Sequence, residues 1–169
     1  MDSETPELNE SDLDATAQKV MAAFAARPTL AHGRSRLYRP RDGGTSVVIE
    51  FASPTGDDWR EASIWIDERG NPSIAFAGWH THADLFEGDF DAGLSQMLQF
   101  LERILADRVL LEPSIVKEPP YIVLDLDDEY EVLDTLTHPR LPLPPKYFSW
   151  SGAGDVRVDE LRARFESRL

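Results

Sequence analysis

The chain has 169 residues, of which 41% are hydrophobic and 28% are charged, and these proportions are typical of an ordinary globular domain. It contains no cysteine, which excludes a disulfide scaffold and a thiolate metal site. A formal net charge of −14 would repel a phosphate backbone, and no apolar run approaches the roughly 20 residues of a membrane span, so we expect neither a nucleic-acid nor a membrane partner.

The N-terminal residues 1–10 are polar and acidic, which predicts a disordered tail. They do not resemble a signal peptide, and together with the absence of cysteine this leads us to expect a cytoplasmic protein. Ser11 and Asp14 then have the spacing of a capping box. Apolar residues at helical spacing follow, so we predict a helix over residues 12–26 that ends before Pro28.

The middle of the chain changes from helical to strand periodicity. Residues 46–51 are β-branched and aromatic, residues 59–67 alternate between apolar and polar, and residues 73–77 are again apolar. Clusters of Pro, Gly, Asp and Asn separate these three segments. Short turns between consecutive strands predict an antiparallel meander.

The second half of the chain begins with an amphipathic helix over residues 92–106, for which Asp89 and Asp91 are candidate caps. Two further strands are predicted at residues 108–112 and 121–126.

A proline-rich stretch at 138–147 has the composition of a stiff extended connector. Residues 148–169 then predict a strand and a C-terminal helix that pack on the same domain as residues 11–137. The elements together predict an α+β fold, in which an antiparallel sheet of about five strands has helices packed on one face.

One motif could support chemistry, and it follows the third predicted strand. His80 and His82 would project from one face if the strand continues through them, and Asp84 would lie on that same face. Two imidazoles and a carboxylate can ligate zinc, and Glu50 on another strand could act as a general base. This pattern gives one alternative function, a zinc-dependent hydrolase.

Residues 78–82, Gly-Trp-His-Thr-His, resemble the His-Ser/Thr-His strand of the JAB/MPN metallo-isopeptidases. The resemblance implies a zinc site at the two histidines and a catalytic role for Glu50. The sequence departs from the family pattern after His82, because Ala83 stands where the family has proline. A Ser-x-x-Asp ligand pair is also missing, since Ser95 is followed by Gln-Met-Leu.

A structural role for the same motif is the competing interpretation. Four carboxylates crowd the segment after His82, so one or both histidines could be bound to a carboxylate. Trp79 and Phe86 would then anchor the loop against the core. The four acids are Asp84, Glu87, Asp89 and Asp91.

A second acidic stretch follows the strand predicted at 121–126, and it contains no basic residue. We predict that it binds a basic protein partner, with Trp79 and Phe86 as apolar anchors. The alternative is a solvated face that serves only solubility. The predicted contact acids are Asp125, Asp127, Asp128, Glu129 and Glu131.

The order of elements around Trp-His-Thr-His-x-Asp resembles a group of small bacterial proteins, some of which are similar to immunity proteins of polymorphic toxin systems. That resemblance implies a protein that neutralises a basic toxin domain and needs no cofactor. We therefore expect a binding protein more than an enzyme. The alternatives are the zinc hydrolase above and a structural or adaptor subunit without catalysis.

Overall fold

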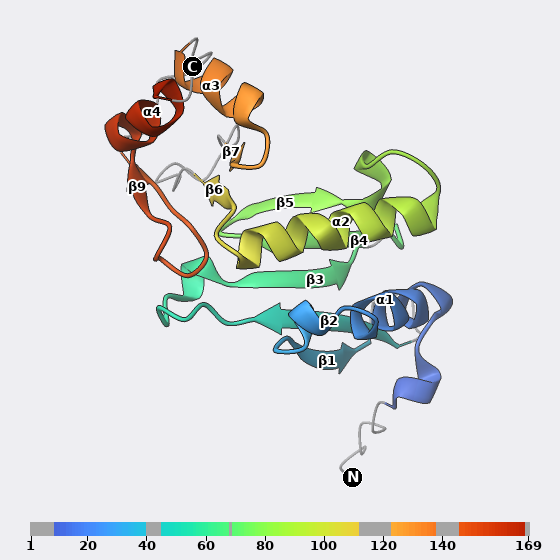
Figure 1. Cartoon of the computed structure of the whole chain (residues 1–169). Helices are drawn as coiled ribbons and strands as arrows, with labels where there is room; N and C mark the ends of the chain where they lie inside the picture. The colour runs from blue at the N-terminus through green and yellow to red at the C-terminus, as the bar shows by residue number, and fades with distance from the viewer. Residues whose placement is uncertain (1–8, 40–44, 68, 112–122, 138–145, 168–169) are drawn as a thin grey trace. The chain divides into compact units, whose positions relative to one another are not determined.

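The computed structural model describes residues 9–39, 45–67, 69–111, 123–137 and 146–167 (Figure 1). Contacts between residues divide the chain into two compact units. The first comprises Met1–Phe51, Ala62–Ala75 and His80–Gln99, and the second comprises Ala52–Glu61, Phe76–Trp79 and Phe100–Leu169. Most of the tail predicted at 1–10 and of the connector predicted at 138–147 lies outside the described residues.

A five-stranded antiparallel sheet dominates the first unit, in the order β1-β2-β3-β4-β5. Its strands are β1 (Arg34–Tyr38), β2 (Ser46–Phe51), β3 (Ala62–Ile66), β4 (Pro72–Phe76) and β5 (Trp79–His82). The predicted α+β fold with an antiparallel sheet is therefore confirmed. Strands β2, β3 and β4 correspond to the predicted meander, whereas β1 was not predicted.

The strand predicted to run on into the histidine motif is interrupted by a turn. Ala77 and Gly78 connect β4 to β5, and both have positive φ, at 51° and 85°. Two central residues with positive φ are the pattern of a type I′ hairpin turn, whose twist matches that of the flanking strands. The motif therefore forms a strand of its own at the edge of the sheet.

Strand alternation separates the two faces of the sheet. Ile49 on β2 lies opposite Ile64 on β3, and both are fully buried. The neighbouring pair, Glu50 and Ser63, lies on the other face. Figure 1 shows α1 (Ala15–Ala25) and the first part of α2 (Phe90–Leu105) over the same face of this sheet, as expected for helices that cover one apolar face.

Helix α1 begins three residues later than predicted because its N-cap is Asp14, not Ser11. The Asp14 carboxylate accepts a hydrogen bond of 2.7 Å from the backbone NH of Ala17. Residues Glu10–Asp12, which were expected to start the helix, form a short 3-10 helix instead. Helix α2 is capped by Asp89, as predicted, through a bond of 2.9 Å from the backbone NH of Ala92.

The second unit contains two small sheets and two helices. Strand β6 (Val109–Leu111) pairs with β7 (Val123–Asp125), and β8 (Lys146–Tyr147) pairs with β9 (Val156–Arg157). The helices are α3 (Glu129–Thr137) and α4 (Val158–Glu166). Their shared core comprises Leu110, Leu124, Leu126, Val132, Leu136, Tyr147, Val156, Leu161 and Phe165.

Three expectations change in this unit. The strands predicted at 108–112 and 121–126 pair with each other and form a separate sheet. The acidic stretch after β7 folds into α3, which was not predicted. The last two residues of the predicted connector form β8. Within the parts of the chain that the structure describes, no helix has the length and hydrophobicity to cross a membrane.

Candidate functional site

The acidic residues after β7 build the start of α3. The Asp125 carboxylate accepts a hydrogen bond of 3.1 Å from the backbone NH of Asp127, which forms the turn. The Asp128 carboxylate accepts one of 2.9 Å from the backbone NH of Glu131, so Asp128 caps the helix. Negative charge at a helix N-terminus is favourable, which explains why so many acids are tolerated here.

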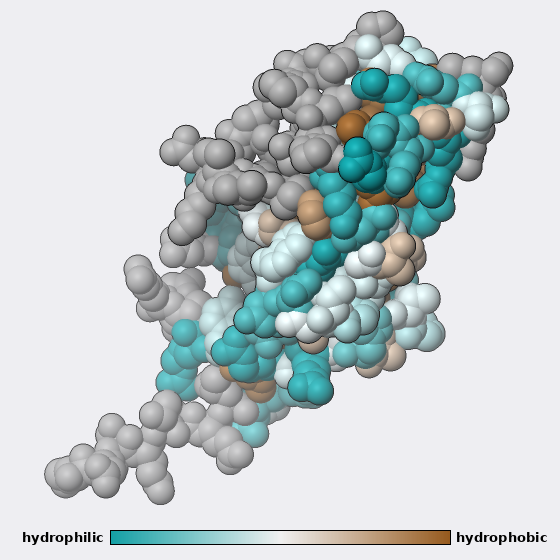
Figure 2. All heavy atoms as spheres, turned by 90° about the vertical axis from the view of Figure 1, so that its left-hand side faces the viewer, coloured by the Kyte–Doolittle hydropathy of each residue, from teal (hydrophilic) through white to brown (hydrophobic). Residues whose placement is uncertain are grey.

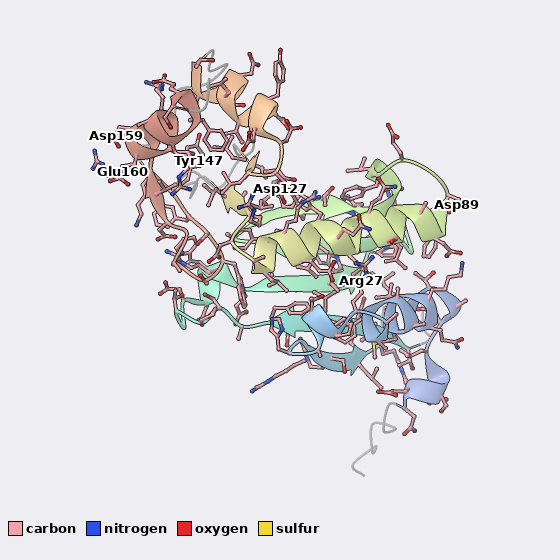
Figure 3. All side chains as sticks on the ribbon, in the orientation of Figure 1. Arg27, Asp89, Asp127, Tyr147, Asp159 and Glu160 are labelled. Carbon is pink, nitrogen blue, oxygen red and sulfur yellow. The ribbon has the colours of Figure 1, made fainter. Side chains whose placement is uncertain are left out.

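Two of the predicted contact acids are held by arginines of the same unit. Asp125 makes an ion pair of 2.9 Å with Arg103, and its side chain is only 19% exposed. Asp127, labelled in Figure 3 between β7 and α3, accepts a hydrogen bond of 3.0 Å from Nε of Arg108. These two carboxylates are therefore locally compensated. Asp127, Asp128, Glu129 and Glu131 are all exposed.

Tyr130 is the most exposed large hydrophobic side chain that the structure describes, at 84%. It lies between Glu129 and Glu131 in the first turn of α3. Tyr130 was not among the predicted contact residues, although helical spacing predicts its exposure. The inward residue Val132 is two positions later, or about 200° around the helix, so Tyr130 must point away from the core.

The two predicted apolar anchors are less accessible than expected. Trp79 is half-buried, and its ring centroid lies 5.5 Å from that of Phe100. Phe86 is also half-buried. The hydrophobic side chains that the same segment exposes are Leu85, at 71%, and Phe90, at 37%.

The histidine motif lies at the edge of the sheet, and its two imidazoles are neighbours. The ring centroids of His80 and His82 are 5.2 Å apart. His82 Nδ1 lies 2.6 Å from Oγ of Ser73 and 3.5 Å from a carboxylate oxygen of Asp67. His82 therefore contacts a carboxylate, as the structural interpretation expected, but from the end of β3 and not from the following acids.

Asp84 does not continue the strand that carries the histidines and is not grouped with them as a metal site, which corrects the predicted arrangement of the three ligands. Strand β5 ends at His82, and Ala83–Leu85 form a 3-10 turn. Asp84 instead accepts a hydrogen bond of 3.2 Å from the side-chain amide of Asn71.

Glu50 is not brought near the histidines either. It lies on β2, three strands away from β5, which corresponds to about 14 Å at the usual strand spacing. Its carboxylate makes an ion pair of 3.1 Å with Arg36. Among the described residues, no three His, Cys, Asp or Glu side chains are grouped so that they could hold a metal ion. Asp84 and Glu50 are therefore not grouped with the two histidines in the way that the zinc-hydrolase alternative requires.

No family model matches the chain, and the searches of curated proteins and of solved structures found no match.

Among the described carboxylates, Asp155 has a strongly lowered pKa, and it stabilises the second unit. Burial raises the pKa of Asp155, but hydrogen bonds from Arg60, the backbone NH of Ser149 and Lys146 outweigh it and lower the pKa to about 2. Arg60 is 5% exposed and also donates to the Ser149 carbonyl at 2.7 Å. These bonds tie residues 57–60 to the loop at 149–155, so this cluster has a structural role.

Proposed function

We propose that this protein binds a basic protein partner and neutralises it, in the manner of a toxin-immunity protein. The contact surface lies on the second unit, where an exposed hydrophobic side chain is set among carboxylates. The first turn of α3, with Tyr130 between Glu129 and Glu131, is its central element.

One observation carries this proposal. In the described parts of the chain, four large hydrophobic side chains are exposed, namely Trp59, Leu85, Phe90 and Tyr130. Acidic residues occupy ten of the sixteen positions that lie within two residues of these four, whereas the chain as a whole has 31 acids in 169 residues. Exposed apolar groups and negative charge therefore occur together far more often than composition requires.

This combination supports binding to a basic protein. An aromatic side chain that becomes desolvated at an interface contributes much of the binding energy, and surrounding acids attract lysine and arginine of the partner. Helix capping accounts for part of this acidity, but neither capping nor solubility requires a large hydrophobic side chain to be exposed among the acids. On the face shown in Figure 2, the described residues are mostly hydrophilic, and those coloured as hydrophobic form only small patches.

The test uses the protein encoded by the adjacent gene, which in toxin systems is the partner. Its affinity for the full chain is measured by calorimetry at 50 and 300 mM NaCl. We expect binding that weakens about tenfold or more at the higher salt, because the attraction is electrostatic. Tyr130→Ala should weaken binding by about 30-fold, the effect of losing a central anchor of about 2 kcal/mol.

Glu160→Gln is the matched control, because Glu160 is an exposed acid in the first turn of another helix, α4 (Figure 3). It should change the affinity less than twofold. Co-expression should also restore the growth of cells that produce the partner. Binding without growth rescue would favour the adaptor alternative, and equal effects of the two variants would refute a surface centred on Tyr130.

A further inference from the structure

The segment between β5 and α2, residues 83–91, exposes two of the four accessible hydrophobic side chains. Leu85 is 71% exposed and Phe90 is 37% exposed. The other two lie elsewhere in the chain: Trp59 is beside the Arg60 guanidinium, and Tyr130 belongs to the surface proposed above. Leu85 and Phe90 are only five positions apart and lie in this one segment.

The segment is held in one conformation by contacts that do not use these two side chains. A Cβ atom on Gly93 would lie 2.4 Å from the Ala83 carbonyl oxygen, so the start of α2 packs directly on the 3-10 turn. The side-chain amide of Gln96 donates to the Glu87 carbonyl at 2.5 Å. Asp89, labelled at the start of α2 in Figure 3, caps the helix.

A rigid display of this kind lowers the cost of binding, because little conformational entropy is lost when a partner docks. Leu85 is exposed on a turn that makes these contacts on both sides. On one side of Leu85, the Asp84 carboxylate accepts a hydrogen bond from the Asn71 side chain, and on the other side the Phe86 side chain is half-buried.

The charge of the segment identifies the class of partner. Residues 83–91 contain four carboxylates and no basic residue. Lys19 contacts the segment through an ion pair of 2.9 Å with Asp91, and its ammonium lies 4.8 Å from the ring centroid of Phe90. That contact also shows how a cation and an apolar face are accommodated together at Phe90.

We propose that residues 83–91 are a second docking surface, which binds a basic amphipathic segment of a protein partner. Apolar side chains of that segment contact Leu85 and Phe90, while its lysines or arginines face Asp84 and Glu87. A second copy of this chain is disfavoured as the occupant, because two chains of net charge −14 repel each other. The inference rests on the proposed function, since it deepens the account of a basic partner.

The probe is a synthetic amphipathic helical peptide made of leucine and lysine, with a peptide of leucine and glutamate as its acidic counterpart. Each is titrated into the isotope-labelled full chain at 150 mM NaCl, and amide shifts are followed by NMR. We expect the basic peptide to shift residues 83–91 and the acidic peptide to shift nothing. Leu85→Ser should weaken binding of the basic peptide at this site at least fivefold, and Glu87→Gln about twofold.

Both changes are at exposed side chains, so the fold is preserved, which the unchanged melting temperature will verify. Tyr130→Ser is the matched control and should leave the shifts at 83–91 intact. Shifts confined to other acidic surfaces, or a Leu85→Ser variant that binds as well as the parent, would overturn this inference and leave the surface at α3 untouched. A dimer detected by sedimentation and lost in Leu85→Ser would overturn it too, since a second copy would then be the occupant.

Discussion

The guanidinium of Arg60 makes two hydrogen bonds to the carboxylate of Asp155, of 2.7 and 2.9 Å, across 95 positions of sequence. The pair is nearly excluded from solvent, since the side chains are 7% and 13% exposed. The Arg60 guanidinium also contacts the rings of Trp59 and Phe148, with centroids at 4.5 and 5.1 Å. This pair fixes the loop before β3 to the loop before β9 within the second unit.

Replacement of Arg60 by methionine should lower the free energy of unfolding by about 3 kcal/mol. The change leaves the Asp155 carboxylate buried without its main partner, and the loss of one member of a buried ion pair is strongly destabilising. Chemical denaturation measures the effect. Arg157→Met is the control, because its ion pair with Asp159 is exposed to solvent, and it should leave the denaturation midpoint unchanged. Equal effects of both changes would contradict this assignment.

The low pKa of Asp155 makes stability depend on pH in the acid range. Its folded-state pKa of about 2 lies below the ordinary value of 3.8, so the unfolded state binds the proton more readily. The contribution is complete above pH 4 and is lost as pH falls toward 2. Between these values the stability difference between the parent and Asp155→Asn should shrink by about 2 kcal/mol. A difference that does not change between pH 4 and pH 2 would refute the linkage.

The turn between β4 and β5 is suboptimal at Ala77, because an alanine with φ of 51° is in the left-handed region that asparagine and glycine tolerate better. Ala77→Asn should therefore raise the free energy of unfolding by about 1 kcal/mol. Gly78→Ala, with φ of 85° at the same turn, should act in the opposite direction. The melting temperatures of the two variants test this prediction, because Ala77→Asn should raise it and Gly78→Ala should lower it. A higher melting temperature for Gly78→Ala would contradict a type I′ turn at these residues.

Gly93 lies inside α2, where alanine ordinarily stabilises a helix by about 1 kcal/mol. Here Gly93→Ala should destabilise the protein by about 1–3 kcal/mol, because the new Cβ would lie 2.4 Å from the backbone oxygen of Ala83. Gln99→Ala, at an exposed position of the same helix, should change the stability by less than about 0.5 kcal/mol. A gain in stability for Gly93→Ala would show that the 3-10 turn does not pack on the helix.

The spacing of apolar residues was sufficient to predict the elements that bury one regular apolar face. The alternation of Ile64 and Ile66 identified β3, and the apolar stripe of α2, which includes the buried Leu94 and Leu98, identified that helix. In contrast, β1 carries Arg34 and Arg36 and has no apolar face that would have identified it. Its pairing with β2 is a tertiary property that strand propensity does not contain.

The candidate site was predicted in outline and missed in detail. The acidic composition pointed to residues 125–131, but only the fold shows that Asp125 and Asp127 are held by arginines. The pairing of β6 with β7 determines this, because it brings Asp125 beside the end of α2, where Arg103 is located. The exposure of Tyr130 could have been deduced had α3 been recognised, since Val132 and Leu136 mark its inner side.

The arginines of β1 have a further consequence for the behaviour of the chain at high concentration. β1 is an edge of the five-stranded sheet, and Arg34, Ser35 and Arg36 are exposed along it. A strand edge with unsatisfied backbone groups can recruit strands from other molecules, and bulky cations obstruct that growth. We therefore expect these two guanidinium groups to hinder edge-to-edge pairing and fibrous aggregation of the folded protein.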